Sequence, residues 1–158
     1  MFAVEARHAL SPRRHIPIRQ IFKTFRMEKK EIKHPDKADQ GFSTGAYSAA
    51  VEIDGWLYIS GQGPIDFKTS KFVSGTIEEE THLTLHNIKR ICEAAGCSMD
   101  DIVKCTVHLS DIGDFDRYNA VYAGYFTNIK PARTTVQSGL GHGIKVEIDA
   151  IARIPGKK

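Results

Sequence analysis

The last regular stretch of the chain decides the fold, and it reads Lys145-Val146-Glu147-Ile148-Asp149-Ala150-Ile151-Ala152-Arg153. Successive side chains of a β-strand point to opposite faces, so this alternation predicts a strand with one apolar and one polar face. The apolar face consists of Val146, Ile148, Ala150 and Ala152. Glu147 leaves the other face, toward solvent or another subunit. A strand with only one apolar face indicates a sheet that helices cover on one side.

Four further strands are expected before this one. Residues 47–53 and 56–60 are rich in β-forming side chains, and Asp54-Gly55 between them favours a type I′ hairpin turn. The next strand has an apolar face made of Val103, Cys105, Val107 and Leu109. Another strand is expected from Arg133 to Ser138, after Pro131 ends the preceding connection.

Two amphipathic helices complete the pattern. Thr76-Ile77-Glu78-Glu79 spells a capping box, apolar residues then recur at helical spacing, and Gly96 supplies a C-terminal stop. The second helix begins at about Asp114 and carries an aromatic stripe that we interpret as core packing. The stripe contains Phe115, Tyr118, Val121, Tyr122, Tyr125 and Phe126. The predicted class is α+β, with two helices packed on one face of a mixed sheet.

Length and charge bound the organisation of the chain. With 158 residues and 41% hydrophobic content, it suits one domain. Residues 1–26 carry a net charge of +5 and the remainder −2. We expect 1–26 to be a basic extension outside the fold (an upstream-start artefact, a targeting peptide or an arm) and 27–158 to form the single domain. The acidic body disfavours nucleic-acid binding.

The sequence predicts neither a membrane span nor a metal site. No stretch approaches the roughly 18 consecutive apolar residues of a membrane span, and a cytoplasmic location is expected. The three cysteines lack the spacing of zinc or redox motifs. His82 and His86 are four apart, but Leu83 stands where a zinc-hydrolase helix has glutamate.

Several motifs together resemble the Rid family (reactive intermediate deaminase, YjgF) from about Gly41 to Ile154. They are Gly45-Ala46-Tyr47-Ser48, Ile59-Ser60-Gly61-Gln62-Gly63-Pro64, Tyr118-Asn119-Ala120-Val121-Tyr122, Pro131-Ala132-Arg133-Thr134-Thr135-Val136 and Val146-Glu147-Ile148-Asp149-Ala150-Ile151-Ala152. The resemblance implies a homotrimer of chorismate-mutase-like subunits with active sites between neighbours. It also implies hydrolysis of 2-imino acids, such as the 2-aminoacrylate tautomer, to 2-keto acids and ammonia, without a cofactor.

The resemblance also implies roles for individual residues. Arg133 matches the arginine that holds the substrate carboxylate, a task that suits a guanidinium fork. Glu147 matches the residue that positions or deprotonates the hydrolytic water. The remaining residues that we expect to line the substrate site are Tyr47, Ser60, Gly61, Asn119 and Thr135. Many family members have a cysteine at the position of Thr135. For Tyr47 and Asn119 the alternatives are a hairpin aromatic and a helix-surface amide.

Two questions stay open in the sequence. The glycine-rich segment 138–143 is interpreted as a flexible hairpin loop, with His142 as a pocket residue as the alternative. The favoured function is an imine deaminase. The alternatives are a non-catalytic small-molecule-binding regulatory trimer, a specialised deaminase for an aminomuconate-like acid, and an RNA-cleaving enzyme that the acidic body disfavours.

Overall fold

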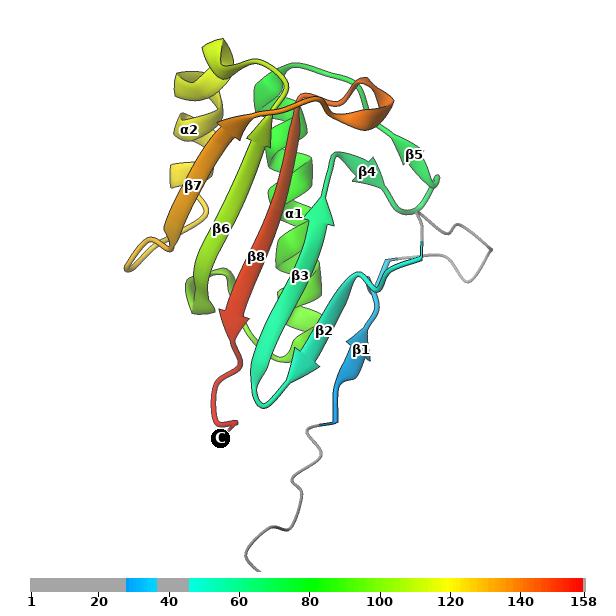
Figure 1. Cartoon of the computed structure of the whole chain (residues 1–158), viewed down its shortest axis with the longest axis vertical. Coiled ribbons are helices and arrows are strands. Elements are labelled where there is room, and N and C mark those ends of the chain that lie inside the picture. Colours follow the sequence, from blue (N-terminus) through cyan, green and yellow to red (C-terminus); the bar gives the residue numbers. More distant parts are fainter. Residues whose placement is uncertain (1–27, 37–45, 158) are drawn as a thin grey trace, which may run out of the picture.

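The computed structural model describes residues 28–36 and 46–157. Its main sheet has six strands in the order β1-β2-β3-β8-β6-β7, and β4 pairs with β5 in a small ribbon. Figure 1 shows both α-helices behind the main sheet. The elements are β1 (Lys30–Ile32), β2 (Ala50–Ile53), β3 (Trp56–Gln62), β4 (Ile65–Asp66), β5 (Lys71–Phe72), α1 (Ile77–Ala95), η2 (Met99–Asp101), β6 (Ile102–Leu109), η3 (Ile112–Asp114), α2 (Phe115–Ala123), β7 (Ala132–Gln137), η4 (Gly141–Gly143) and β8 (Val146–Arg153). The predicted α+β class with two helices on one face is confirmed, whereas the extension 1–26 lies outside the described residues.

The first helix begins and ends where the sequence predicts. The Thr76 hydroxyl accepts a hydrogen bond from the Glu79 N–H at 3.3 Å, and the Glu79 carboxylate accepts one from the Thr76 N–H at 2.8 Å. Gly96 ends the helix with a φ of 83°, a left-handed conformation that glycine adopts without steric cost. The apolar face of α1, which includes Leu85, Ile88 and Ile91, is fully buried against the sheet.

The strand β8 lies in the middle of the sheet, between β3 and β6, and pairs with both in antiparallel register. Its predicted apolar side chains are buried on the face under the helices, which we call the covered face; they are Val146, Ile148, Ala150 and Ala152. Glu147 and its neighbours on the opposite face, called the open face here, are half-buried. The prediction that Glu147 points away from the helices is therefore confirmed.

A buried carboxylate fixes the start of β8 relative to α1. Glu80 is 1% exposed and accepts hydrogen bonds from the backbone N–H of Lys145 at 2.6 Å and from that of Gly75 at 3.2 Å. The Lys145 ammonium lies 3.2 Å from the same carboxylate. Because the Glu80 carboxylate accepts hydrogen bonds from several donors, these contacts offset the cost of burying its charge. The contact sets the position of β8 along its own axis, and with it the position of Glu147.

The turn between β2 and β3 is the expected hairpin. Asp54 and Gly55 have φ angles of 50° and 71°, and two successive positive values are what a type I′ turn requires. The strand β3 runs on to Gln62, and its pairing with β8 becomes irregular between Ile59 and Gln62. This irregularity contains Ser60 and Gly61, two of the predicted site residues.

Two local expectations were wrong. Val103 is 43% exposed, because the pairing of β6 with β8 shifts between Ile102 and Lys104 and gives Ile102 the buried position instead. The segment 138–143 is not a hairpin loop, since β7 runs parallel to β6 and β8 lies on the other side of β6. The segment crosses over β6 and contains η4, where the ring of His142 stacks on that of Phe72 at 4.1 Å between centroids.

In the described part of the chain, no helix has the length and apolar character needed to cross a membrane. The same residues contain no group of three or more histidine, cysteine, aspartate or glutamate side chains placed to hold a metal ion. His82, one of the two helical histidines considered above, instead lies 3.2 Å through its Nδ1 from the Tyr125 hydroxyl.

Candidate active site

Arg133 extends from β7 on the covered face and packs against α2. Its guanidinium donates hydrogen bonds to the Tyr118 hydroxyl at 3.3 Å and to the Asn119 amide oxygen at 2.9 Å. The guanidinium carbon also lies 4.5 Å from the ring centroid of Tyr122 and 5.5 Å from that of Phe115. The faces of aromatic rings attract cations, so these contacts hold the charge in a fixed orientation.

The partners of this guanidinium are all neutral. An arginine has five N–H donors, and the two hydrogen bonds above leave the others for a ligand. Burial raises the pKa of the Tyr118 hydroxyl and of the Tyr122 hydroxyl, so neither supplies a phenolate. Among the described residues, no carboxylate forms an ion pair with Arg133. A half-buried cation without a negative partner favours binding of an anion, and the fork geometry suits a carboxylate.

The aromatic stripe of α2 therefore does more than the sequence indicated. Tyr118 and Tyr122 are buried in the core, as predicted, and Phe126 is buried as well, although α2 ends at Ala123 and Phe126 lies beyond the helix. Phe115, Tyr118 and Tyr122 also surround Arg133, a role that the helical spacing alone did not reveal. The available signal in the sequence was the dipeptide Tyr118-Asn119 followed by Arg133. This signal does not show that the three residues meet, because their contact depends on the register of β7.

Glu147 extends from β8 on the open face and lies directly over Gly61. A Cβ atom placed on Gly61 would come within 2.3 Å of Glu147 Oε1 and 3.0 Å of its Cδ. Only a glycine allows this approach, because real Cβ atoms essentially never come closer than 3.0 Å to another heavy atom. The absence of a side chain at Gly61 therefore leaves the space that the Glu147 carboxylate occupies.

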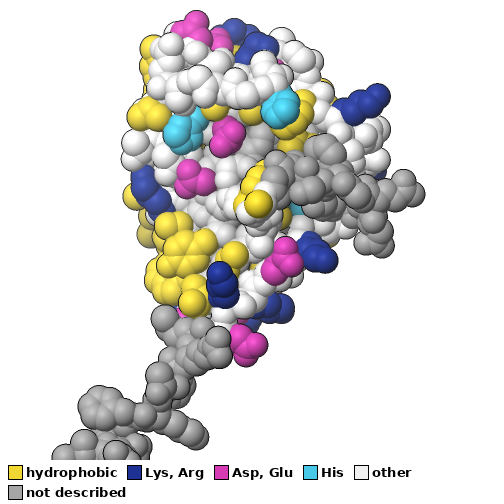
Figure 2. All heavy atoms as spheres, turned by 45° about the vertical axis from the view of Figure 1, so that its right-hand side comes forward, with side chains coloured by type: hydrophobic (Ala, Val, Ile, Leu, Met, Phe, Trp, Pro, Cys, Tyr) yellow, Lys and Arg dark blue, Asp and Glu magenta, His cyan; other side chains and the backbone are white. Residues whose placement is uncertain are grey.

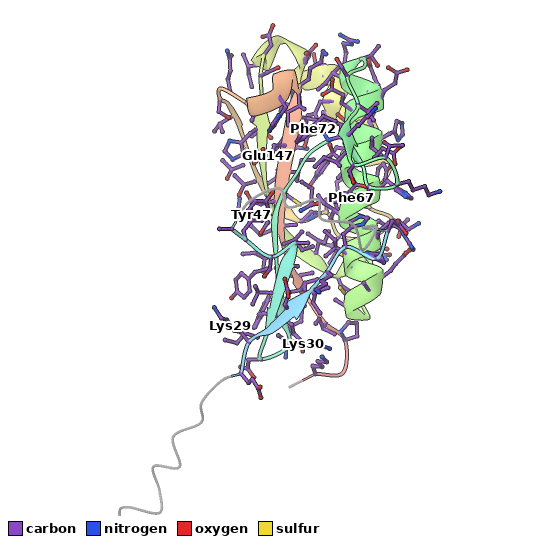
Figure 3. All side chains as sticks on the ribbon, turned by 90° about the vertical axis from the view of Figure 1, so that its right-hand side faces the viewer. Lys29, Lys30, Tyr47, Phe67, Phe72 and Glu147 are labelled. Atoms are coloured by element: carbon purple, nitrogen blue, oxygen red, sulfur yellow. The ribbon has the colours of Figure 1, made fainter. Side chains whose placement is uncertain are left out.

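Tyr47 and Ser60 are the other two candidate residues on this side of the sheet, and they have different surroundings. Tyr47 is 52% exposed, and Figure 3 shows it, like Glu147, on the side of the sheet away from α1. Together with Gly61 it lines a small cavity of about 40 Å³. The Ser60 hydroxyl is occupied, since it donates a hydrogen bond to the Ser48 carbonyl at 2.8 Å. This hydrogen bond therefore holds the irregular part of β3 against the residues that precede β2.

The seven predicted site residues form two groups on opposite faces of the sheet. Arg133 and Asn119 meet on the covered face, and Thr135 follows Arg133 on the same face, in register with the buried Val107. Figure 2 shows acidic and histidine side chains gathered on the open face, above an apolar patch. The open-face group contains Tyr47, Ser60, Gly61 and Glu147. The sheet itself separates the two groups within one chain.

These features define a class of α+β protein that presents a guanidinium on the covered face of its sheet and a carboxylate on the open face. A family model described as endoribonuclease L-PSP matches residues 39–154. The chain therefore belongs to this family, which contains the Rid (YjgF) proteins.

Similar proteins come from distant organisms. A RutC family protein of Pyrococcus horikoshii is 49% identical over 109 residues, which are 68% of this chain and 86% of the relative. The human 2-iminobutanoate/2-iminopropanoate deaminase is 43% identical over 109 residues, or 68% of this chain and 80% of the human protein. The crystal structure of Escherichia coli TdcF with bound serine has a TM-score of 0.70 and 34% identity, and the match covers 78% of this chain and 98% of TdcF.

Proposed function

We propose that this protein hydrolyses small 2-imino acids to 2-keto acids and ammonia, at sites that form between copies of the chain. The observation that carries the proposal is the unpaired Arg133 guanidinium on aromatic rings, together with a Glu147 carboxylate held over a glycine. The printed name of the human relative describes the same class of reaction, and the TdcF structure contains an amino acid, whose carboxylate resembles that of an imino acid.

In this mechanism Arg133 binds and orients the substrate carboxylate. Two charge-assisted hydrogen bonds to the fork fix the plane of the carboxylate and place the C=N carbon beyond it. Asn119 and Tyr118 hold the guanidinium and prevent it from turning away. The carbon of an iminium group is already electrophilic, so the reaction needs water and a base rather than a nucleophilic side chain.

Glu147 supplies the base. The carboxylate accepts a proton from water as the new C–O bond forms at the imine carbon. Its place over Gly61 leaves the exposed side of the carboxylate directed away from the sheet, toward the open face. Tyr47 lies on the same side and would cover the bound substrate.

A substrate with few atoms cannot touch both faces of one sheet. The guanidinium of one copy must therefore meet the carboxylate of another, and such head-to-tail contacts form a ring when the rotation between copies closes. We propose a ring of three, which also covers the exposed apolar side chains of the open face, Trp56 and Tyr58, both more than a third exposed in the single chain. Light scattering that reports a monomer at micromolar concentration would refute this arrangement.

The direct test uses freshly generated imine. A dehydratase or amino-acid oxidase produces 2-aminoacrylate or a related imine in place, and ammonia or keto-acid release is followed after subtraction of spontaneous hydrolysis. Removal of two charge-assisted hydrogen bonds in Arg133→Ala should lower kcat/KM by about 10²–10⁴-fold, and Arg133→Lys should restore only part of the loss. Glu147→Gln should lower kcat by about 10²–10⁴-fold with little change in KM.

Mixing these two inactive variants tests the shared site. When Arg133→Ala and Glu147→Gln chains are unfolded, mixed in equal amounts and refolded, about one site in four should combine an intact arginine with an intact glutamate. Activity should then return to about a quarter of the wild-type value. If each site belonged to a single chain, the mixture would stay inactive, whereas each variant refolded alone serves as the control.

A further inference from the structure

His108 lies beside Glu147, on the adjacent strand and on the same face of the sheet. The antiparallel pairing of β6 with β8 sets His108 opposite Glu147, and both flanking residues of His108, Val107 and Leu109, are fully buried on the covered face. His108 therefore lies on the open face beside Glu147. Directly opposed residues on one face of an antiparallel pair have Cβ atoms about 4.5–5.5 Å apart. The two side chains can reach the same water or the same substrate atom.

A second contact fixes the imidazole. His108 Nδ1 lies 2.8 Å from the hydroxyl oxygen of Ser138, in the segment that crosses from β7 to β8. With one ring nitrogen engaged there, Nε2 is the nitrogen left to exchange a proton with a ligand, and the side chain is half-buried.

The other polar groups around His108 are less suited to this role. On the open face, β8 adds Asp149 two residues beyond Glu147, and β6 itself adds Lys104. The Lys104 ammonium donates a hydrogen bond to the Thr134 hydroxyl at 2.8 Å. From the neighbouring β7, Ala132, Thr134 and Val136 face this side, and none of them titrates near neutral pH. His108 is the histidine that lies opposite Glu147 on the neighbouring strand.

We propose that His108 is a second catalytic residue, which protonates the departing nitrogen while Glu147 handles the attacking water. The inference rests on the proposed function. The substrate enters as the protonated iminium (C=NH2+); Glu147 takes a proton as the water oxygen bonds to the iminium carbon, and a carbinolamine with a neutral NH2 group results. Protonated His108 then gives its Nε2 proton to this nitrogen. As the C–N bond breaks and the C=O bond forms, the hydroxyl proton passes to His108. The released ammonia takes the proton from Glu147 and leaves as ammonium, so both side chains return to their starting states.

The test compares wild-type protein with His108→Gln across pH, on the same generated imine. Glutamine keeps a hydrogen-bonding side chain but exchanges no proton near neutral pH. We expect kcat of the variant to be about 10²-fold lower at about pH 6, with KM little changed, and the difference to shrink as pH rises, because a deprotonated imidazole cannot act as an acid. Because both proteins use the same substrate, protonation of the imine itself cancels in the ratio of the two rates.

Two variants serve as controls. His86→Gln changes an exposed histidine on α1 and should retain the wild-type rate at every pH. Ser138→Ala removes the partner of Nδ1 but leaves the imidazole, so its loss should be smaller. If His108→Gln lowers the melting temperature by more than about 5 °C, His108→Asn, which can still reach Ser138, replaces it.

The possible results distinguish a failure of the role proposed for His108 from a failure of the proposed imine hydrolysis. A rate ratio that stays constant with pH, or a Ser138→Ala variant that reproduces the whole loss, would show that His108 only holds the crossing segment. A wild-type rate in His108→Gln would overturn this inference and leave the imine hydrolase intact. Absence of ammonia release by the wild-type protein would overturn the proposed function, and the inference with it.

Discussion

Gly61→Ala offers a sharp separation of folding from activity. The new Cβ would lie 2.3 Å from Glu147 Oε1, and the carboxylate must retreat by about 0.7 Å to restore the usual minimum of 3.0 Å. The obstacle is the far end of a flexible side chain rather than backbone, so the fold can accommodate the methyl group. Alanine is also favoured over glycine inside a strand by about 0.5–1 kcal/mol. We therefore expect the melting temperature to change little.

The same displacement should be costly for catalysis. Misplacement of a catalytic group by about 1 Å can lower a rate by about 10²-fold, so kcat of Gly61→Ala should fall by about that factor. The assay is ammonia release from the generated imine, with thermal unfolding measured on the same sample. Gly124→Ala is the matched control, since Gly124 has right-handed helical angles and its Cβ would meet only the Val121 carbonyl at 3.4 Å. Wild-type turnover in Gly61→Ala would refute the water-handling role of Glu147.

Four further expectations concern binding and stability. Asn119→Ala removes a hydrogen bond to the guanidinium and should lower kcat/KM about 10-fold, while Asn119→Asp would add a competing charge and lower it further. Burial lowers the pKa of His34 from 6.5 to about 4. The stability that depends on its neutral form is therefore complete above about pH 6.5 and falls as pH drops toward 4. The free energy of unfolding measured in urea should fall by about 3 kcal/mol over that range, and the His34→Phe variant should lack this loss. Thr76→Ala removes the cap of α1 and should cost about 1 kcal/mol, or about 2–4 °C in melting temperature. Deletion of residues 1–26 should leave melting temperature and turnover unchanged, and a fall of several degrees would show that they pack on the domain.

The elements with strong local signals were predictable from the sequence. The capping box and the left-handed Gly96 bound α1, and Asp54-Gly55 sets the hairpin, because each depends on a few adjacent residues. The alternation in β8 even gave the direction of Glu147. By contrast, β1 is only three residues long, and pairing with β2 rather than its own composition makes it a strand.

The strand or helix that carries each candidate residue was predictable, but the division of these residues between two faces of the sheet was not. Arg133 lies on an edge strand whose residues alternate weakly, so only the parallel register with β6 shows that it shares a face with Cys105 and Val107. The partners of Arg133 on α2 depend on the same register. The exposed Val103 has a similar cause, since a shift in strand pairing leaves no trace in a pattern of apolar residues.

Thr135 has a consequence for the chemical durability of this protein. It follows Arg133 on the same face of β7, and its hydroxyl, unlike a thiol, does not react with peroxide or with alkylating electrophiles. Cys105, which pairs with Arg133 in the register of β6 and β7, is 1% exposed, and burial raises the pKa of its thiol. The thiolate is the form that oxidants attack, so this sulfur is protected as well. We expect the proposed turnover to survive treatment with hydrogen peroxide and iodoacetamide.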